Sequence, residues 1–319
     1  MNRREGFALA LSACALAVSL ALALGLSLPG GGAESARILV HVRVPEAAVA
    51  LLVGGSLGLS GLLYQLVLRN PLADPYVLGV AGGATFATVL VLLLSAGTAA
   101  MMGLGLQAGA AFAGGMATLV VLMRLSEGRT ESLLLCGVIA NTAFAAGARL
   151  LTVWLSPSEI ATVTAYLVGF VPTPPWVAPV LLAPPAAYAF VRFSRAGRGL
   201  DLLLLTDEEA TSLGLAVRKV RREALVLATL LASASVALCG MLGFVGLVVP
   251  HVARLLAGHR HRALVPASFL LGASFLLAAH AVGKALSGVW FLPVGVYTTL
   301  VGAPLFLYLL VRSTRRAWP

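Results

Sequence analysis

The side chains that could carry out chemistry in this chain are few, because most of its length is apolar. Ionisable and amide groups inside apolar stretches are typical of ion pathways and of sites that meet a solute. The candidates are Gln65, Gln107, Asn141, Arg149, His280 and Lys284. Arg149 could meet an anionic solute or extend its guanidinium group to the end of its span. The sequence indicates no Asp or Glu inside an apolar span, which weakens a proton-relay interpretation.

Motifs of known enzymes and metal sites are missing from the sequence. It contains no Gly-rich phosphate loop with Lys, no H-E-x-x-H, no C-x-x-C and no G-x-S-x-G. His259 and His261 lie in the basic turn GHRHR, which is more typical of a solvated turn than of a metal site. Cys14, Cys136 and Cys239 lie inside apolar runs, without metal-ligand or disulfide spacing. We therefore predict no catalytic residue, metal or cofactor in this chain, and no convincing set of paired groups for an intramembrane enzyme.

The composition predicts a multi-pass membrane protein. The chain has 319 residues, of which 60% are hydrophobic and 11% charged, with a mean hydropathy of +0.98. A soluble domain carries about 25% charged residues. The net charge of +10 would suggest nucleic acid in a soluble protein, but here Lys and Arg lie in short loops, where they set topology. The expected partner of this surface is a lipid bilayer, not nucleic acid.

The apolar runs define the elements that must position these side chains. They lie near 7–28, 45–68, 77–97, 103–124, 131–154, 176–193, 223–253, 264–286 and 294–312. Basic residues before the first run and after the last predict two cytoplasmic termini, which requires an even number of crossings. The run 223–253 is long and flanked by basic clusters on both sides, so we expect it to enter and return, with a break near Cys239, Gly240 or Gly243. The expected fold is all-α, with ten crossings in a single membrane domain over 1–319 and no soluble domain.

Three stretches predict close packing or irregular backbone near the membrane. Gly54, Gly58 and Gly61 have nearly the small-xxx-small spacing that lets helices approach closely, so the second run should be central. The following segment 69–84 contains two prolines that would break a helix, and irregular backbone there must be buried in protein or line a cavity. Between 155 and 175, about 12 apolar residues bounded by prolines predict a partial helix on the external face.

The longest polar interval, 194–222, contains the pattern of a short capped helix. In Thr206-Asp-Glu-Glu209, the Thr206 hydroxyl can accept from the backbone N–H of Glu209, whose carboxylate can reach back to Thr206. Gly214 is placed to end the helix about two turns later. A membrane protein rarely needs such a helix for its own fold. We therefore predict a helix that projects from the cytoplasmic side toward a partner, rather than a merely solvated loop.

Several segments together resemble a known family. They are RVPEAAVALLVGGSLGLSGLLYQLVLRNPLADPYVLGVAGGA (43–84), LLLCGVIAN (133–141), TDEEATSLGL (206–215), GFVGLVVPHVARLLAGHRHRALVPASFLLGA (243–273) and LPVGVYTTLVGAPLFLYLL (292–310). The chain resembles the permeases of type II ABC importers for ferric siderophores, cobalamin and haem. The resemblance implies a ten-span homodimer in a bacterial-type cytoplasmic (inner) membrane. It also implies two copies of a separate ATPase that bind ATP and Mg²⁺, and an external binding protein that delivers the solute.

The resemblance also implies roles for particular residues. The ATPase-coupling positions would be Thr206, Asp207, Glu208, Glu209, Ala210, Leu213 and Gly214, within the cytoplasmic loop 194–222. Arg37 and Arg43 would dock the binding protein, and Asn141, Arg149, His280 and Lys284 would lie along the translocation pathway. The chain departs from the family pattern at Glu46, where an Arg is usual, at His280 and Lys284, which replace Asp and Arg, and near 170–176.

The cargo implied is a bulky metal chelate, ranked as ferric siderophore, then cobalamin, then haem. The alternative from another class is an ion-coupled secondary transporter that works without an ATPase. It would explain the composition and the spans, but it leaves the capped helix without a role.

Overall fold

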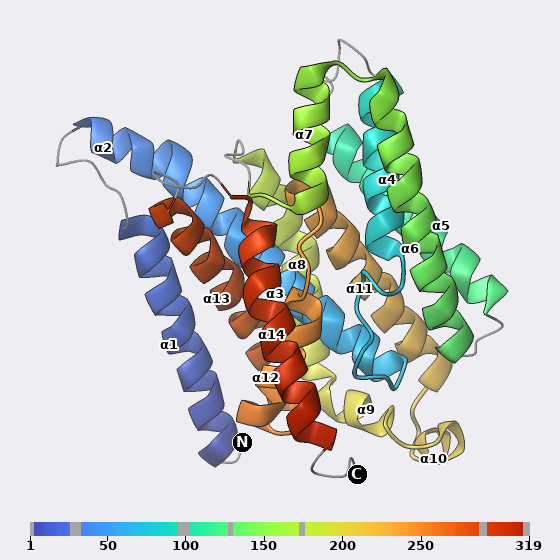
Figure 1. The fold of residues 1–319 in the computed structure, drawn as a ribbon. Helices are drawn as coiled ribbons and strands as arrows, with labels where there is room; N and C mark the ends of the chain where they lie inside the picture. Colours follow the sequence, from blue (N-terminus) through green and yellow to red (C-terminus); the bar gives the residue numbers. More distant parts are fainter. Residues whose placement is uncertain are drawn as a thin grey trace.

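The computed structural model describes residues 3–25, 33–94, 103–126, 130–171, 176–286 and 292–314. These residues form helices joined by turns, and no strand occurs among them (Figure 1). The α-helices are α1 (Arg3–Gly25), α2 (Ala33–Ile38), α3 (Val44–Val67), α4 (Val80–Leu94), α5 (Gly103–Leu125), α6 (Thr130–Leu151), α7 (Pro157–Val168), α8 (Val177–Arg195), α9 (Gly197–Leu202), α10 (Asp207–Ser212), α11 (Val217–Cys239), α12 (Val245–Ala257), α13 (His261–Leu286) and α14 (Val294–Thr314). A π-helical segment, η1 (Leu39–Arg43), joins α2 to α3, and a 3₁₀ segment, η2 (Thr152–Trp154), follows α6.

Many of these helices suit a bilayer. Within the described residues, six helices are long and apolar enough to cross a membrane: α1, α3 with its preceding turns, α6, α8, α11 and α13. Shorter apolar helices occur at Val80–Leu94, Gly109–Leu125, Val245–Ala257 and Val294–Leu309. Large apolar side chains such as Leu135, Ile139, Leu300 and Leu307 point outward, as expected for helices surrounded by lipid. The predicted all-helical, multi-span architecture is confirmed.

The two ends of the bundle differ. The start of α1 and the end of α14 lie at the same end as α9 and α10, whereas α2 and α7 lie at the opposite end (Figure 1). We call these the α10 end and the α7 end. The predicted ten crossings and cytoplasmic termini stay predictions. The 12-residue α7 matches the partial helix expected between 155 and 175, while residues 172–175 of the divergent segment lie outside the described residues.

Helix α3 lies at the centre of the bundle. It continues from the preceding turns without a break, so that Ala36–Val67 forms one helix of 32 residues. Its small residues face α13 and α12: a β-carbon on Gly54 would overlap the carbonyl oxygen of Gly272, and one on Gly61 would overlap that of Gly246. Glycine is therefore required for this close approach. The predicted central position of this span is correct.

The run 223–253 is broken as predicted. Helix α11 ends at Cys239, Gly240 has φ +69°, and α12 begins after Phe244, which has φ +67°. The break is hydrogen-bonded to the last turn of α7 and the residues just after it. The N–H of Phe170 donates to the Cys239 carbonyl over 2.9 Å, and the N–H of Met241 donates to the Tyr166 carbonyl over 3.1 Å. Backbone groups released by the break are thus satisfied within the protein, which is the condition for irregular backbone at membrane depth.

The segment between α3 and α4 is a folded loop rather than a solvated turn. Ala73, Asp74 and Leu78 are buried. The side chains of Asn70 and Asp74 accept from backbone N–H groups two residues on, at 2.8 and 2.9 Å, which fixes two consecutive turns. The expected burial of irregular backbone here is confirmed.

Candidate docking site at the α10 end

The short helix α10 begins with the predicted capping box. The backbone N–H of Glu209 donates to the Thr206 hydroxyl over 3.3 Å, and the N–H of Thr206 donates to a Glu209 carboxylate oxygen over 3.0 Å. The Thr206 hydroxyl also donates to that oxygen, at 2.8 Å. Hydrogen bonds from the side chain and then the backbone of Thr206 hold the pKa of Glu209 below its ordinary value. The Glu209 carboxylate therefore caps the start of the helix.

The other end of α10 closes as the sequence predicts. Gly214 has φ +84°, a left-handed conformation that glycine adopts without strain. Its N–H donates to the Thr211 carbonyl over 2.9 Å, and the N–H of Leu215 donates to the Ala210 carbonyl over 3.0 Å. This pair of bonds is a Schellman motif. A six-residue helix is thus capped at both ends without help from a partner.

The side chains of α10 divide into inward and outward groups. Ala210 is buried, so among the predicted coupling positions it packs against the protein rather than facing a partner. Leu213 is 61% exposed, and Leu204 just before the helix is 54% exposed. Glu208 is also exposed and forms no hydrogen bond or ion pair with the part of the chain that the structure describes. An acid beside exposed leucines at a water-facing end of a membrane protein is typical of a protein-docking surface.

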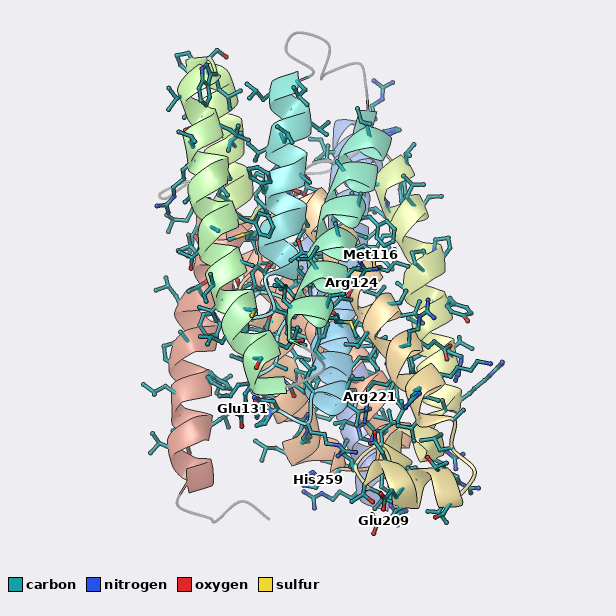
Figure 2. All side chains as sticks on the ribbon, turned by 90° about the vertical axis from the view of Figure 1, so that its right-hand side faces the viewer. Met116, Arg124, Glu131, Glu209, Arg221 and His259 are labelled. Carbon is teal, nitrogen blue, oxygen red and sulfur yellow. The ribbon has the colours of Figure 1, made fainter. Side chains whose placement is uncertain are left out.

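Asp207 remains exposed but points the other way, toward α11 and the turn after α3. Its carboxylate binds the Arg221 guanidinium through two hydrogen bonds of 3.1 and 2.9 Å, and Arg69 Nη2 donates to the same carboxylate over 3.1 Å. The hydrogen bond from Arg221 is the largest cause that holds the pKa of Asp207 below its ordinary value. Figure 2 shows Arg221 at the same end of the bundle as Glu209. Asp207 is therefore shared by two cations, Arg69 from the turn after α3 and Arg221 from α11.

Arg69 also fixes the linker before α10. Its guanidinium donates to the carbonyl of Leu203, at 3.2 and 3.3 Å, and to that of Leu205. Arg69 follows α3 and has φ +48°, an uncommon conformation for a residue with a side chain. The end of α3 and the linker between α9 and α10 are thus joined by one side chain.

A second acid anchors α9. The N–H of His261, the first residue of α13, donates to Asp201 over 3.0 Å, and His261 Nδ1 lies 2.7 Å from the same oxygen. Burial opposes the shift, yet the hydrogen bonds from His261 hold the pKa of Asp201 below its ordinary value. His261 is buried, so the prediction that it lies in a solvated turn is wrong, whereas His259 is exposed as predicted. The difference arises because α9, which the sequence did not indicate, covers the start of α13.

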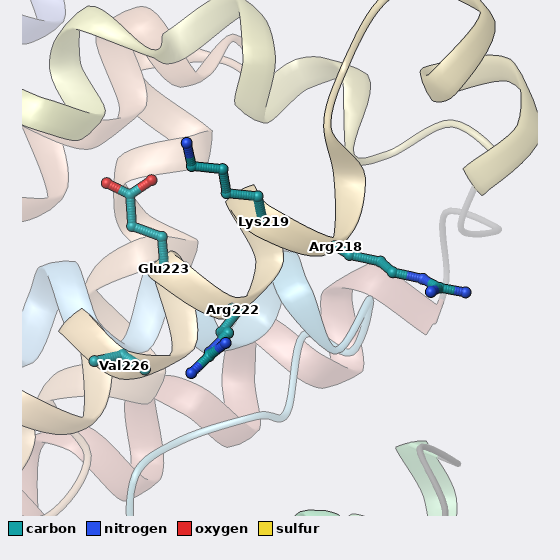
Figure 3. Close-up of a pocket in the computed structure, with 5 residues that line it drawn as sticks. All are labelled: Arg218, Lys219, Arg222, Glu223 and Val226. Atoms are coloured by element: carbon teal, nitrogen blue, oxygen red, sulfur yellow. The ribbon is translucent and has the colours of Figure 1, made fainter.

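A basic basin opens on the first turns of α11. It is lined by Arg218, Lys219, Arg222, Glu223 and Val226, and Figure 3 shows Lys219 and Glu223 on the same side of the helix. Glu223 also pairs with Arg192 of α8 over 2.7 Å. Three of the five side chains that line the basin are cationic and one is acidic.

The α7 end contains an ionic cluster that the sequence did not indicate. Glu46, in the first turn of α3, is buried and pairs with Lys284 Nζ, while His280 Nε2 lies 3.5 Å from Glu46 Oε2. The expectation that no acid lies inside an apolar span is therefore wrong. Glu46 replaces the expected Arg and His280 and Lys284 replace the expected Asp and Arg, so the departures from the family pattern are neighbours in space. The pair joins α3 to α13.

The remaining predicted site residues lie apart from one another. Arg37 is exposed near the start of the long α3 unit, whereas Arg43 is partly buried, with Nη1 enclosed and without a partner in the described part of the protein. Asn141 lies in the middle of α6 with its amide oxygen enclosed against Gly82 of α4. Arg149 is exposed in the last turn of α6. Only His280 and Lys284 of the predicted pathway set are brought together.

Comparison with known proteins identifies the family. Residues 6–312 match the FecCD transport family. The chain belongs to this family. It is 39% identical over 282 residues to the Fe(3+) dicitrate transport system permease protein FecD of Escherichia coli, covering 88% of this chain and 87% of FecD. It is 36% identical over 287 residues to the cobalamin import system permease protein BtuC of Halobacterium salinarum, covering 88% of this chain and 75% of BtuC.

A solved structure agrees with this assignment. It is described as an inward-facing conformation of a metal-chelate type ABC transporter, and it matches with a TM-score of 0.85 at 29% identity, covering 96% of this chain and 99% of its own. The FecCD chain is therefore a membrane permease component rather than a catalytic subunit. In its described residues, no group of three or more His, Cys, Asp and Glu side chains lies close enough together to hold a metal ion.

Sequence reasoning located α10 in this FecCD chain but missed what holds it. Arg69 and Arg221 were not predicted to contact α10, because each was explained by its place in a basic loop. The available signal was weak: Arg69 lies two residues before Pro71 of the folded loop, and Arg221 follows α10 in the same polar interval. Neither position identifies Asp207 as its partner.

Proposed function

We propose that this chain is the permease subunit of an ATP-driven importer. Two copies would form a homodimer with ten spans each, in a bacterial-type cytoplasmic membrane, with the α10 end in the cytoplasm. Two copies of a separate ATPase would dock there, and an external binding protein would deliver the solute at the α7 end. Membership of the FecCD family supports this assembly.

The observation that carries the proposal is that some side chains of α10 build and hold the helix while others face outward. The helix is complete without a partner, and it holds Glu208 and Leu213 outward at the end of the bundle where α1 begins and α14 ends. Because the helix forms without a partner, it can transmit the displacement of a partner that docks on it. Alternating access would then follow from ATP binding and hydrolysis in the ATPase, with no ATP or Mg²⁺ bound by the permease.

The cargo we propose is a bulky metal chelate. Relatives named for ferric dicitrate and for cobalamin transport support that class, and we keep the order ferric siderophore, cobalamin, haem. At the α7 end, exposed Arg37 is the stronger candidate for docking an acidic binding protein, because Arg43 is partly enclosed.

The test is co-purification of the permease with the ATPase encoded beside it. We expect a complex of two permeases and two ATPases, lost when residues 206–214 are replaced by a Gly/Ser linker of equal length. A linker variant that still binds the ATPase would overturn the docking role of α10. A permease that purifies alone and moves a solute without ATP would instead favour an ion-coupled secondary transporter, with Glu46, His280 and Lys284 as the residues to test.

A further inference from the structure

The three acids at the start of α10 have three different roles. Glu209 closes the capping box on Thr206, and Glu208 faces outward. Asp207 alone turns inward and binds Arg69 and Arg221. Since the two cations come from the end of α3 and the start of α11, Asp207 is the point where α10 is connected to the membrane helices.

The connection to α3 is stiff. Arg69 binds the Asp207 carboxylate and the carbonyls of Leu203 and Leu205 at once. It is also the first residue of the folded loop that leads to α4. A displacement of α10 therefore acts on the end of α3 through several hydrogen bonds from one planar group, whose directions are fixed.

The connection to α11 is equally directional. Arg221 approaches with two nitrogens, one on each carboxylate oxygen of Asp207. Such a two-point bond resists rotation as well as separation. Arg221 lies in the second turn of α11, which runs from the α10 end to the break at Gly240. One carboxylate thus connects α10 to two helices that reach toward the α7 end.

Stability of α10 does not account for this network. The side chains of Arg69, Asp207 and Arg221 are 42%, 55% and 31% exposed, and exposed ion pairs contribute little to stability. The helix already has a cap at each end. A docked partner would exclude water from these pairs and strengthen them, since charges attract more strongly where the effective dielectric constant is lower.

We propose that Asp207 is the positioning residue that transmits ATPase movement to α3 through Arg69 and to α11 through Arg221. The inference rests on the proposed function and assigns its transmission step to one carboxylate. It separates docking, which uses the outward face of α10, from transmission, which uses the inward face. The two steps can therefore be broken independently.

The experiment uses the full permease with its ATPase in lipid nanodiscs. The three native cysteines are replaced, and Val40→Cys, an exposed site on the turns that continue into α3, reports movement at the α7 end. Its rate of reaction with a maleimide is measured without nucleotide and with ATP plus vanadate. ATPase affinity for the permease is measured on the same samples.

We expect Asp207→Asn to reduce the nucleotide-dependent change in labelling rate by about fivefold or more, the size of a typical coupling between sites. ATPase affinity should stay within about twofold of the parent value. The melting temperature should stay within about a degree or two, as for loss of an exposed ion pair. Arg69→Gln should reproduce the loss, and Asp207→Glu should retain much of the response. Arg218→Gln is the matched control, because it removes a charge from α11 that does not contact Asp207.

Suppose that the parent complex binds the ATPase and its labelling rate responds to nucleotide. Three results would then overturn the inference: a full labelling response in Asp207→Asn, an equal loss of response in Arg218→Gln, or a loss of response explained entirely by weaker ATPase binding. A parent complex that neither binds the ATPase nor responds to nucleotide would instead contradict the proposed function.

Discussion

Helix α3 has an ionic network at each of its ends, and the two differ in their access to water. At the α7 end, Glu46 pairs with Lys284 and His280, with side-chain exposures of 5%, 25% and 7%. At the α10 end, Arg69 and Arg221 share the half-exposed Asp207. Similar ionic groups are therefore buried at one end of α3 and exposed to water at the other.

The difference implies different roles. Removing one member of a buried pair leaves a charge without compensation, so the buried network cannot be rearranged at low cost. In the exposed network, water can replace each lost bond. The Glu46 network therefore fixes α3 to α13, whereas the hydrogen bonds of the Asp207 network can be exchanged for hydrogen bonds to water.

The largest effect is expected from breaking the buried network. Lys284→Met should destabilise the protein by about 3–5 kcal/mol, because the Glu46 carboxylate would stay buried without this partner. Thermal unfolding in detergent or nanodiscs measures the change. The double variant Glu46→Gln/Lys284→Met should recover much of the loss, since neither charge remains. A double variant as unstable as the single one would show that Lys284 acts through packing instead.

A smaller but still large effect is expected between the two networks, where α3 is closely packed. Gly61→Ala should cost about 1–3 kcal/mol or more, because its methyl group would overlap the Gly246 carbonyl and cores resist overpacking. Gly109→Ala is the matched control, since nothing lies near its added carbon and alanine favours helix. Melting temperatures of the two variants should move in opposite directions. Equal shifts would contradict the close contact of α3 with α12.

At the exposed end, the effect should be local. Thr206→Ala should cost α10 about 1 kcal/mol, the usual loss on removing an N-cap, without changing the global melting temperature. Amide exchange of residues 207–212 measures it. Thr211→Ala is the control, because its hydroxyl donates within the helix to the Asp207 carbonyl and is not a cap. If both variants exchange alike, the capping box does not hold α10.

The smallest effect is a pH dependence of the same cap. The pKa of Glu209 is lowered in the folded protein, so its contribution is complete above the unfolded value of about 4.3. It is lost as the pH falls through the lower folded value. Amide exchange of α10, corrected for its intrinsic pH dependence, should show constant protection from pH 7 to about 5 and a loss below about 4. Glu209→Gln, which can still cap, should lack this loss.

What could be predicted from the sequence was largely local. The bounds of α10 followed from Thr206, Glu209 and Gly214, because caps act between residues a few positions apart. The break after Cys239 followed from basic residues on both sides of a long apolar run. In each case the residues that cause the feature lie within the same short segment of the sequence.

The networks could not be predicted, because their members are distant in the chain. Asp207 and Arg69 are 138 positions apart, and Glu46 and Lys284 are 238 apart. Single charged residues near apolar runs are equally consistent with solvated loop ends. His261 was misjudged for the same reason: only the fold brings α9 over the start of α13. Pairing of this kind is a property of helix packing, which residue spacing does not encode.

The helix from Ala36 to Val67 is continuous and longer than a bilayer crossing requires. At 1.5 Å per residue its 32 residues span about 48 Å, well beyond the roughly 30 Å hydrocarbon core. With its fulcrum at the Arg69 end, a tilt of about 10° carries the far end sideways by about 8 Å. Because Gly54 and Gly272 bring it into close contact with α13, the two helices would move together. A small displacement at the α10 end would therefore produce a larger one at the α7 end.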